Sequence, residues 1–281
     1  MTSRQAEVDG VPVRWEEEGD GLPVVLIHGI PTSPDLWRHV TPRLPGVRVL
    51  AFEMVGYGRS IPAGREHDIS VAAQASYLDA WLDHLDVERA VLVGHDLGGG
   101  VAQIAAVTRP ERCAGLVLTN AIAYDSWPIP SVKALRATSR LLARTPDAPF
   151  KALMGTLLAR GHDDLEMAAE SLDVHYRHYA DADGAAGMAR QVRALDVNDT
   201  LAVADRLPDL DVPARIVWGL ADRFQTADYG ERLARDLGTR PIGITGGKHF
   251  TPEDHPGPVA DAVLDLVAEV ERTPDLARQA R

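Results

Sequence analysis

Apolar residues follow two alternating patterns along this chain. Short continuous runs rich in Val, Ile and Leu are typical of strands buried on both faces, and segments with an apolar residue every three or four positions are typical of helices. The clearest helical segment is 70–85, where Ser70 is suited to cap the first turn, and another helix is expected over 34–44. Asp9-Gly10 predicts a tight hairpin near the N-terminus. The runs predicted as strands are 23–27, 47–52, 91–94, 114–119, 214–219 and 241–245, and the first two are expected to be buried.

The alternation of strands and helices predicts an α/β fold, with a mostly parallel sheet covered by helices on both faces. The alternation stops over residues 123–206, where helical segments are separated by prolines and glycines. We therefore expect a helical cap inserted after the sixth strand, counting the two strands of the N-terminal hairpin. The core would then consist of residues 1–122 and 207–272, followed by a frayed tail over 273–281.

One buried strand leads directly into a glycine-flanked polar residue. Gly94-His95-Asp96-Leu97-Gly98 follows the strand, and an alanine-rich helical pattern begins at once. Small residues on either side of a tight turn let one side chain stand exposed between strand and helix, an arrangement known as the nucleophile elbow. Serine hydrolases have GxSxG at this turn, whereas this chain has Asp96 in place of the serine. We therefore expect Asp96 to be the nucleophile.

Two further polar residues follow later strands in an order that suits catalysis. In a parallel sheet, functional groups gather at the carboxyl ends of the strands, and Asp222 and His249 each follow a predicted strand. The order nucleophile, acid and histidine is that of α/β-hydrolases. We predict that Asp222 orients His249, and that the backbone N–H groups of Ile30 and Leu97 form an oxyanion hole.

An aspartate nucleophile restricts the possible chemistry. A carboxylate with an ordinary pKa of ~3.9 is already ionised at neutral pH and needs no base before it attacks. Attack on an ester carbonyl would give an anhydride that collapses backwards, because carboxylate is the better leaving group. Attack on a saturated carbon that bears a halide or an epoxide oxygen gives a stable alkyl ester on Asp96. His249 is then free to activate the water that hydrolyses this ester.

Several motifs together resemble the aspartate-nucleophile branch of the α/β-hydrolase superfamily, which contains epoxide hydrolases and haloalkane dehalogenases. The resemblance covers nearly the whole chain outside the cap and implies the α/β-hydrolase fold. By position, it implies that Asp96 is the nucleophile, His249 the base and Asp222 its acidic partner; some dehalogenases carry the acid at the position of Asn120. The motifs are His28-Gly29-Ile30-Pro31, Gly56-Tyr57-Gly58-Arg59-Ser60, Tyr77-Leu78-Asp79-Ala80 and Gly94-His95-Asp96-Leu97-Gly98-Gly99.

The residues next to the motifs favour an epoxide over a haloalkane. Haloalkane dehalogenases resemble one another in placing Trp directly after the nucleophile, and usually an Asn or a second Trp nearby, to bind the halide. This chain has Leu97 and Ile30 at the corresponding positions. An epoxide hydrolase is therefore our first hypothesis, and a haloalkane dehalogenase is the second. A third is a non-hydrolytic lyase, a cyclase or a ligand-binding protein on the same fold.

Aromatic residues of the cap are candidates for substrate binding. Epoxide hydrolases usually hydrogen-bond the ring oxygen with a pair of cap tyrosines, and this cap offers Tyr124, Tyr176 and Tyr179. Tyr176 and Tyr179 lie at i,i+3 spacing and so on one side of a helix. Trp127 is expected to wall the pocket or to donate its indole N–H to a halide.

Composition limits the partners. The net charge is -12 and Lys and Arg do not cluster, which argues against nucleic acid. With Cys113 as the only cysteine, neither an intrachain disulfide nor a cysteine metal cluster can form. We expect no cofactor and no metal, with His175 and His178 on a solvated helix face. No stretch approaches the ~20 apolar residues of a membrane span. We therefore expect a small-molecule substrate, no membrane partner, a cytoplasmic location, and a monomer or homodimer.

Overall fold

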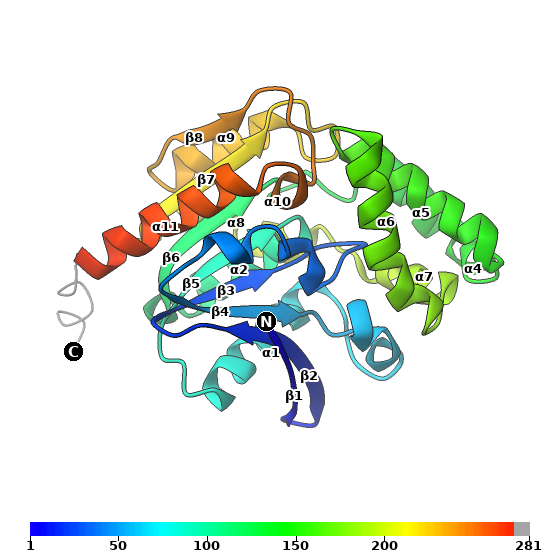
Figure 1. Cartoon of the computed structure of the whole chain (residues 1–281), viewed down its shortest axis with the longest axis horizontal. Coiled ribbons are helices and arrows are strands. Elements are labelled where there is room, and N and C mark those ends of the chain that lie inside the picture. The colour runs from blue at the N-terminus through cyan, green and yellow to red at the C-terminus, as the bar shows by residue number, and fades with distance from the viewer. Residues whose placement is uncertain (273–281) are drawn as a thin grey trace.

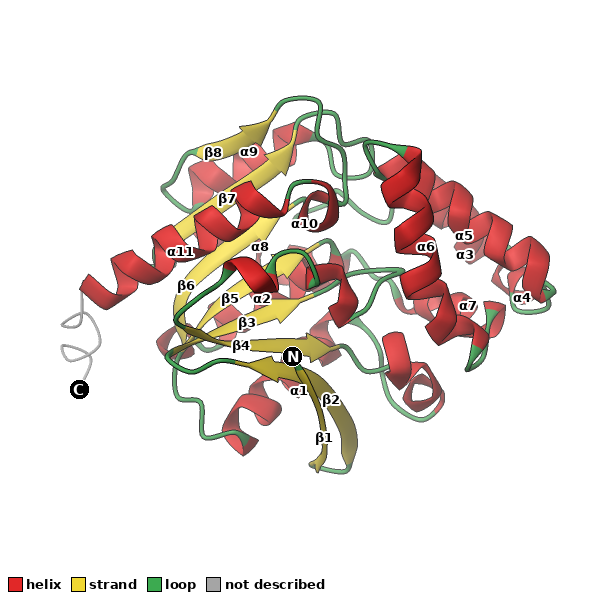
Figure 2. Ribbon diagram, viewed as in Figure 1, coloured by secondary structure: helices red, strands yellow, loops and turns green. Residues whose placement is uncertain are grey.

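An eight-stranded sheet forms the centre of the computed structural model, which describes residues 1–272; the tail predicted over 273–281 lies outside the described residues. Its strands are β1 (Thr2–Val8), β2 (Val11–Glu18), β3 (Leu22–Ile27), β4 (Val47–Glu53), β5 (Ala90–His95), β6 (Cys113–Thr119), β7 (Ala214–Gly219) and β8 (Pro241–Ile244). Their order across the sheet is β1-β2-β4-β3-β5-β6-β7-β8 (Figures 1 and 2). The strands β3 to β8 pair parallel to one another, whereas β2 pairs antiparallel with both β1 and β4. The predicted mostly parallel sheet is confirmed.

The prediction of an N-terminal hairpin is confirmed, but the prediction of a helix over 34–44 is wrong. Asp9 and Gly10 both have positive φ, 51° and 78°, as the tight turn between β1 and β2 requires. Residues 34–44 instead form two short 3₁₀ turns, Pro34–Trp37 and Thr41–Arg43. The proline at position 42 lacks a backbone N–H and its ring crowds the preceding turn, so a continuous α-helix does not pass through it.

The two faces of the sheet carry separate hydrophobic layers because side chains alternate along each strand. In β3, Val25 and Ile27 pack with one cluster and Val24 and Leu26 with the other. The first face is covered by α1 (Val71–His84), α2 (Leu97–Thr108), α8 (Asn198–Ala204) and α9 (Ala227–Asp236). The second is covered by the two 3₁₀ turns and by α11 (Pro256–Arg272).

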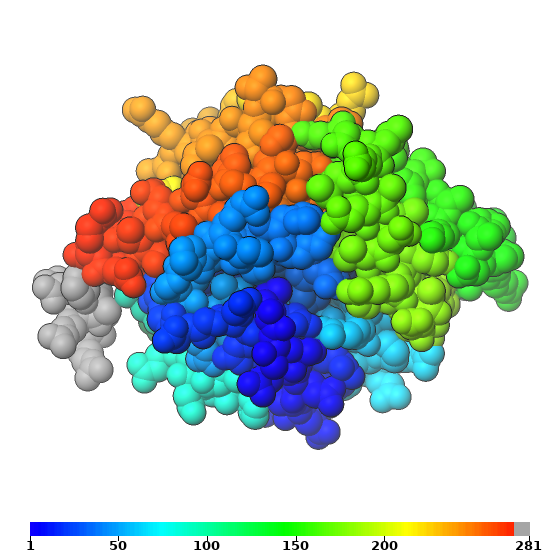
Figure 3. Space-filling view, in the orientation of Figure 1, coloured from blue at the N-terminus to red at the C-terminus, as the bar shows by residue number. Residues whose placement is uncertain are grey.

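Helices between β6 and β7, which we call the cap, lie at one end of the sheet (Figure 2). They are α3 (Pro130–Ala137), α4 (Ser139–Leu142), α5 (Asp147–Gly161), α6 (Leu165–Ala180) and α7 (Ala185–Ala194). They share a small apolar cluster that includes Met154 and Met188. In the space-filling view the cap lies directly against both parts of the core (Figure 3). The helix α8 lies within the predicted cap range but packs against α2 of the core.

Glycines allow the turn between β5 and α2 to lie tightly against the neighbouring strand. A Cβ atom added to Gly98 would stand 2.1 Å from the carbonyl oxygen of Ile27 and 2.4 Å from that of His28. A Cβ at Gly94 would stand 2.4 Å from the carbonyl oxygen of Gly98. All of these obstacles are backbone atoms, so side chains cannot relieve the clash by moving.

We predict that Gly98→Ala lowers the free energy of unfolding by about 3 kcal/mol or more, because β3 or α2 must shift to admit the methyl group. Urea unfolding followed by circular dichroism measures this loss. Gly257→Ala is the matched control, since a Cβ there meets nothing within 4 Å. Equal midpoints for Gly98→Ala and the unsubstituted protein would contradict the prediction.

Candidate active site

Asp96 occupies the tip of the turn between β5 and α2. Its backbone has φ 51° and ψ -120°, a conformation that non-glycine residues rarely adopt. The side chain is buried, Oδ2 accepts a 2.9 Å hydrogen bond from the backbone N–H of Ile30, and the backbone N–H of Leu97 also donates to the carboxylate. Gly29 makes this close approach possible, because a Cβ there would stand 2.4 Å from Oδ2. The two N–H groups predicted as an oxyanion hole thus both donate to the carboxylate of Asp96.

His249 and Asp222 come together beside Asp96. Nδ1 of His249 lies 2.8 Å from Oδ2 of Asp222, so this nitrogen donates to the carboxylate. Nε2 consequently points toward Asp96 and lies 3.8 Å from its Oδ1. That distance is too long for a hydrogen bond, so Oδ1 keeps its lone pairs available. The structure therefore brings together the three side chains that the sequence analysis selected.

Asn120 supports Asp222, a contribution that the sequence analysis missed. Its Nδ2 donates to Oδ2 of Asp222 at 2.6 Å, and its Oδ1 accepts from the N–H of Gly219 and the hydroxyl of Thr251. The other oxygen of Asp222 accepts from the N–H of Phe224 at 2.7 Å. The only signal in the sequence was that Asn120 follows β6, where some relatives of the resembled branch carry the acid.

Burial and neighbouring charges shift the pKa of each member of this group. Burial raises the pKa of Asp96, and the opposing effects of His249 and the Ile30 N–H do not cancel it. Burial also acts to raise the pKa of Asp222, but His249 and two hydrogen-bond donors outweigh it and leave the pKa lowered. For His249, burial lowers the pKa, whereas Asp222 and Asp96 raise it more strongly. Asp222 is therefore the negatively charged member of the pair that it forms with His249.

The free side of Asp96 faces a small, mostly apolar cavity of about 80 Å³ between core and cap. A larger hollow of about 550 Å³ lies at the surface near α1 and α2, but none of the three residues lines it. Apart from Trp127, four of the lining residues have polar side chains: Asp96, His249, Ser131 and Gln225. The apolar lining includes Ile30, Leu97, Ile122, Trp127, Val132, Leu135, Leu157, Met188, Val192, Leu195, Phe224 and Phe250.

The three tyrosines predicted to bind substrate do not line this cavity, which corrects our expectation. Each hydroxyl donates to a partner within the protein: Tyr124 to Asp236 at 2.6 Å, Tyr176 to Asp147, and Tyr179 to Gln191 at 2.7 Å. The i,i+3 spacing of Tyr176 and Tyr179 does place them on one side of α6, but that side faces the cap's own apolar cluster.

Trp127 does line the cavity, and its indole N–H is engaged. Nε1 of Trp127 donates to the hydroxyl of Thr200 at 2.7 Å, and that hydroxyl donates to the backbone oxygen of Tyr124. The indole ring of Trp127 therefore contributes an apolar wall to the cavity, while its N–H group is used in the hydrogen bond to Thr200.

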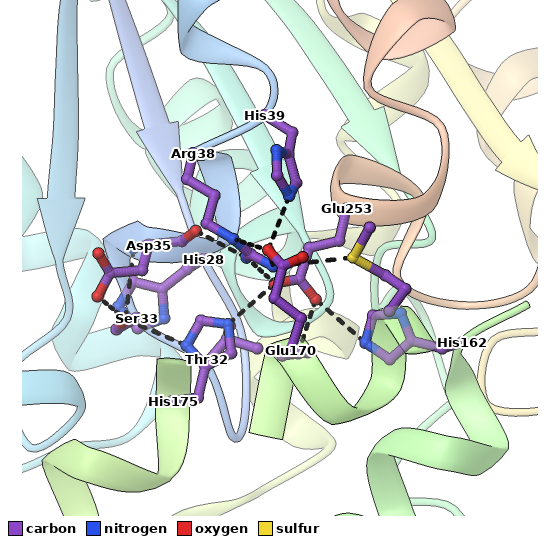
Figure 4. A network of polar contacts seen from close by, with 12 residues as sticks. His28, Thr32, Ser33, Asp35, Arg38, His39, His162, Glu170, His175 and Glu253 are labelled. Carbon is purple, nitrogen blue, oxygen red and sulfur yellow. Dashed lines mark hydrogen bonds and ion pairs between the residues drawn. The ribbon is translucent and has the colours of Figure 1, made fainter. Parts of the chain in front are cut away.

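A buried polar cluster fixes the short helix α10 (Thr251–Asp254), which follows His249 directly. Glu253 is its centre and receives contacts from the core and from the cap (Figure 4). Arg38 pairs with Glu253, and Nε2 of His175 lies 3.2 Å from its Oε1. Nε2 of His162 lies 3.1 Å from Oε2 of Glu253 in a direction too poor for a hydrogen bond, and its Nδ1 lies 3.0 Å from Asp254.

This cluster corrects our expectation that His175 and His178 lie on a solvated face. His175 is buried and also contacts the hydroxyl of Ser33, and His178 is buried against Asp35 at 3.0 Å. Both histidines lie on α6, so they join the cap to the core. The cluster thus links the position of the cap to the segment that carries His249.

Residues 1–272 contain no grouping of three or more His, Cys, Asp or Glu side chains arranged to hold a metal ion. Over the same residues, the longest apolar helices fall short of what is needed to cross a membrane.

Sheet order, elbow and the Asp96–Asp222–His249 arrangement together define a hydrolase of the α/β class. In agreement, the family described as alpha/beta hydrolase fold matches residues 23–256, so the chain belongs to this family. It is 27% identical to the uncharacterized hydrolase YugF of Bacillus subtilis, over 94% of this chain and 97% of that protein. It is 28% identical to haloalkane dehalogenase 2 of Mycobacterium tuberculosis, over 90% of each. A crystal structure of an alpha/beta hydrolase fold protein from Burkholderia ambifaria has a TM-score of 0.87 at 26% identity, covering 93% of this chain and 97% of that one.

We predict that the polar cluster makes stability fall at alkaline pH. Burial alone lowers the pKa of His162, but Asp254 and Glu253 outweigh it and raise the pKa to about 9. Because the folded-state pKa lies above the unfolded value, the stabilisation is complete below pH ~6.5 and is lost as the pH rises through ~9. It amounts to a free energy of unfolding on the order of 3 kcal/mol.

Urea midpoints between pH 6 and pH 9.5 check this prediction. The unsubstituted protein should lose more stability over this range than His162→Gln, which has no imidazole to titrate. Parallel pH profiles for the two proteins would contradict it.

Proposed function

We propose that this protein hydrolyses a bond between a saturated carbon and a leaving group, with Asp96 as the nucleophile. The observation that carries this proposal is the unequal treatment of the two oxygens of Asp96. Oδ2 accepts the backbone N–H of Ile30 at 2.9 Å, whereas Oδ1 faces Nε2 of His249 at 3.8 Å, beyond hydrogen-bond distance. One oxygen is thereby oriented, and the other is left to react.

In the first step, Oδ1 of Asp96 attacks a saturated carbon in the cavity. The carbon–oxygen bond forms as the bond to the leaving group breaks, and the electron pair departs with that group. The apolar lining of the cavity excludes water from the carboxylate and holds an apolar molecule of a few non-hydrogen atoms against it. Asp96 becomes a neutral ester.

In the second step, water hydrolyses this ester. Nε2 of His249 takes a proton from the water while Asp222 stabilises the imidazolium through Nδ1. The hydroxide attacks the ester carbonyl of Asp96, and the negative charge of the tetrahedral intermediate develops on Oδ2. That oxygen already accepts from Ile30, and the N–H of Leu97 also donates to this carboxylate, so donors for the oxyanion are already in place. Collapse of the intermediate breaks the bond between the carbonyl carbon and the alkoxide oxygen, and the imidazolium of His249 returns its proton to this oxygen, so the alcohol leaves. The carboxylic acid left on Asp96 then ionises to the carboxylate.

Two leaving groups fit this mechanism, an epoxide oxygen and a halide. Leu97 and Ile30, in place of the halide-binding residues of the resembled dehalogenases, favour the epoxide. The hydroxyls of Tyr124, Tyr176 and Tyr179 are already hydrogen-bonded within the protein, which weakens the case for an epoxide. Opening of an epoxide needs an acid for the developing alkoxide. The similarity to a haloalkane dehalogenase over 90% of both chains favours the halide. The first step is common to both substrates.

We predict that His249→Gln accumulates a covalent ester on Asp96, because the first step does not need the imidazole and the second does. Intact-protein mass spectrometry after incubation with a panel of small epoxides and a panel of small haloalkanes measures the adduct. An epoxide adds its whole mass, whereas a haloalkane adds its mass less that of HX. Asp96→Asn is the control and should form no adduct. If His249→Gln forms none with any member of either panel, the proposal is wrong, and a lyase or binding role is favoured.

The two steps should respond to pH differently. Ester formation needs ionised Asp96, so its acid limb should lie above the ordinary Asp pKa of ~3.9, since burial raises the pKa of Asp96. Ester hydrolysis needs neutral His249. Forming the ester removes the charge of Asp96, one of the two charges that raise the pKa of His249, so that pKa should fall in the intermediate.

Single-turnover decay of the ester against pH, compared with an NMR titration of His249 in the free protein, tests this. The rate of ester decay should rise with pH through a pKa that is lower than the pKa of His249 in the free protein. A decay pKa equal to or above the free value would contradict the mechanism.

A further inference from the structure

Gln225 presents an uncommitted amide at the cavity that contains Asp96. The residue lines this cavity and is only 3% exposed to solvent. Its Oε1 is enclosed and makes no hydrogen bond with any residue between 1 and 272. Buried amides are normally paired, because an unsatisfied polar group costs free energy, on the order of 1–3 kcal/mol. Such an amide beside the reactive carboxylate points to a ligand as its partner.

The loop that carries Gln225 is held firmly. Its backbone oxygen accepts a 2.9 Å hydrogen bond from Nε1 of Trp218. One residue earlier, the N–H of Phe224 donates to Oδ1 of Asp222. The same carboxylate that orients His249 therefore also fixes the backbone next to Gln225. The backbone that carries this amide thus has a defined position relative to the reacting group, as a site that binds developing charge requires.

Few other side chains in the cavity can donate a hydrogen bond to a departing atom. Ile30 and Leu97 are apolar, and the indole N–H of Trp127 already donates to Thr200. Ser131 carries a hydroxyl, but it is partly exposed and lies in the first turn of α3. Gln225 is the buried side chain that remains as a candidate donor to the departing atom. Because no hydrogen bond holds either end of its terminal amide, a half-turn can direct the N–H toward the cavity.

We propose that the side-chain amide of Gln225 donates a hydrogen bond to the leaving atom during the attack by Asp96, and that this atom departs as a halide. The inference rests on the proposed function and assigns its substrate class. As the Asp96 Oδ1–carbon bond forms and the carbon–halogen bond breaks, the electron pair leaves on the halide. The N–H of Gln225 stabilises the anion, and no proton changes place in this step.

The chemistry of an amide explains the choice between the two leaving groups. An alkoxide from an epoxide is strongly basic and must be protonated, but an amide N–H is far too weak an acid to supply a proton. A halide is a stable anion that needs only hydrogen bonds. The small cavity keeps any molecule that reaches Asp96 close to the lining groups. An amide donor in an apolar pocket therefore suits a halide.

Halide binding tests the inference without turnover. Asp96→Asn removes the charge of the nucleophile and so imitates the neutral ester. Titrating this variant with sodium bromide at constant ionic strength should quench the fluorescence of Trp127, which lines the same cavity. Adding Gln225→Met should weaken bromide binding at least tenfold. Thr226→Ala, an exposed neighbour on the same loop, is the control and should bind as the Asp96→Asn variant does.

Ester formation tests the inference during the reaction. In the His249→Gln background, Gln225→Met should slow the appearance of the Asp96 ester by about 10²-fold, within the range measured for removing one donor from a developing anion. The loss should be larger for chloroalkanes than for iodoalkanes, because chloride concentrates its charge and needs the donor more. A purely structural role would slow all leaving groups equally. Melting curves establish that each variant is folded.

The outcomes separate this inference from the proposed function. If esters form from haloalkanes and Gln225→Met leaves both bromide affinity and ester formation unchanged, the inference is overturned and the proposed function stands. The same holds if Ser131→Ala abolishes bromide binding instead, or if esters form only from epoxides. If no ester forms in any protein, the proposed function fails. Absence of bromide binding to Asp96→Asn would also overturn the inference.

Discussion

The arrangement of the site depends on two backbone hydrogen bonds to a buried carboxylate. Burial of Asp96 opposes its ionisation, and the N–H groups of Ile30 and Leu97 partly offset this cost. Ile30 approaches Oδ2 closely only because Gly29 has no side chain, and the elbow glycines let α2 begin against β3. In the proposed reaction, this arrangement determines which oxygen attacks and which one later bears the negative charge. The same pair of hydrogen bonds thus serves both halves of the proposed reaction.

The sequence was sufficient for the features that depend on local pattern. Continuous apolar runs located the strands, and Gly94, Gly98 and the polar residue between them located the elbow. The order of Asp96, Asp222 and His249 predicted their meeting, because parallel strands align their carboxyl ends. The prediction of a helix over 34–44 was wrong because it gave more weight to the apolar spacing than to the proline at position 42.

Features that depend on distant segments could not be predicted. The spacing of Tyr176 and Tyr179 correctly placed them on one side of a helix, but only the folded cap shows that their hydroxyls meet Asp147 and Gln191. His175 is buried because Glu253, 78 residues further along the chain, lies against it. Gln225 has an unremarkable sequence context, and its importance comes from lining a cavity whose other walls belong to the cap.

The base of the cap is joined by hydrogen bonds across its two connections to the core. Thr200, where the chain returns, accepts from Trp127 and donates to the backbone of Tyr124, where the chain leaves. This crossing closes a neck that α8 anchors on α2. Beyond the neck, His175 of α6 contacts Glu253 of α10, so the cap is joined to the core at a second place. A substitution that moves α6 would therefore also disturb the segment that carries His249.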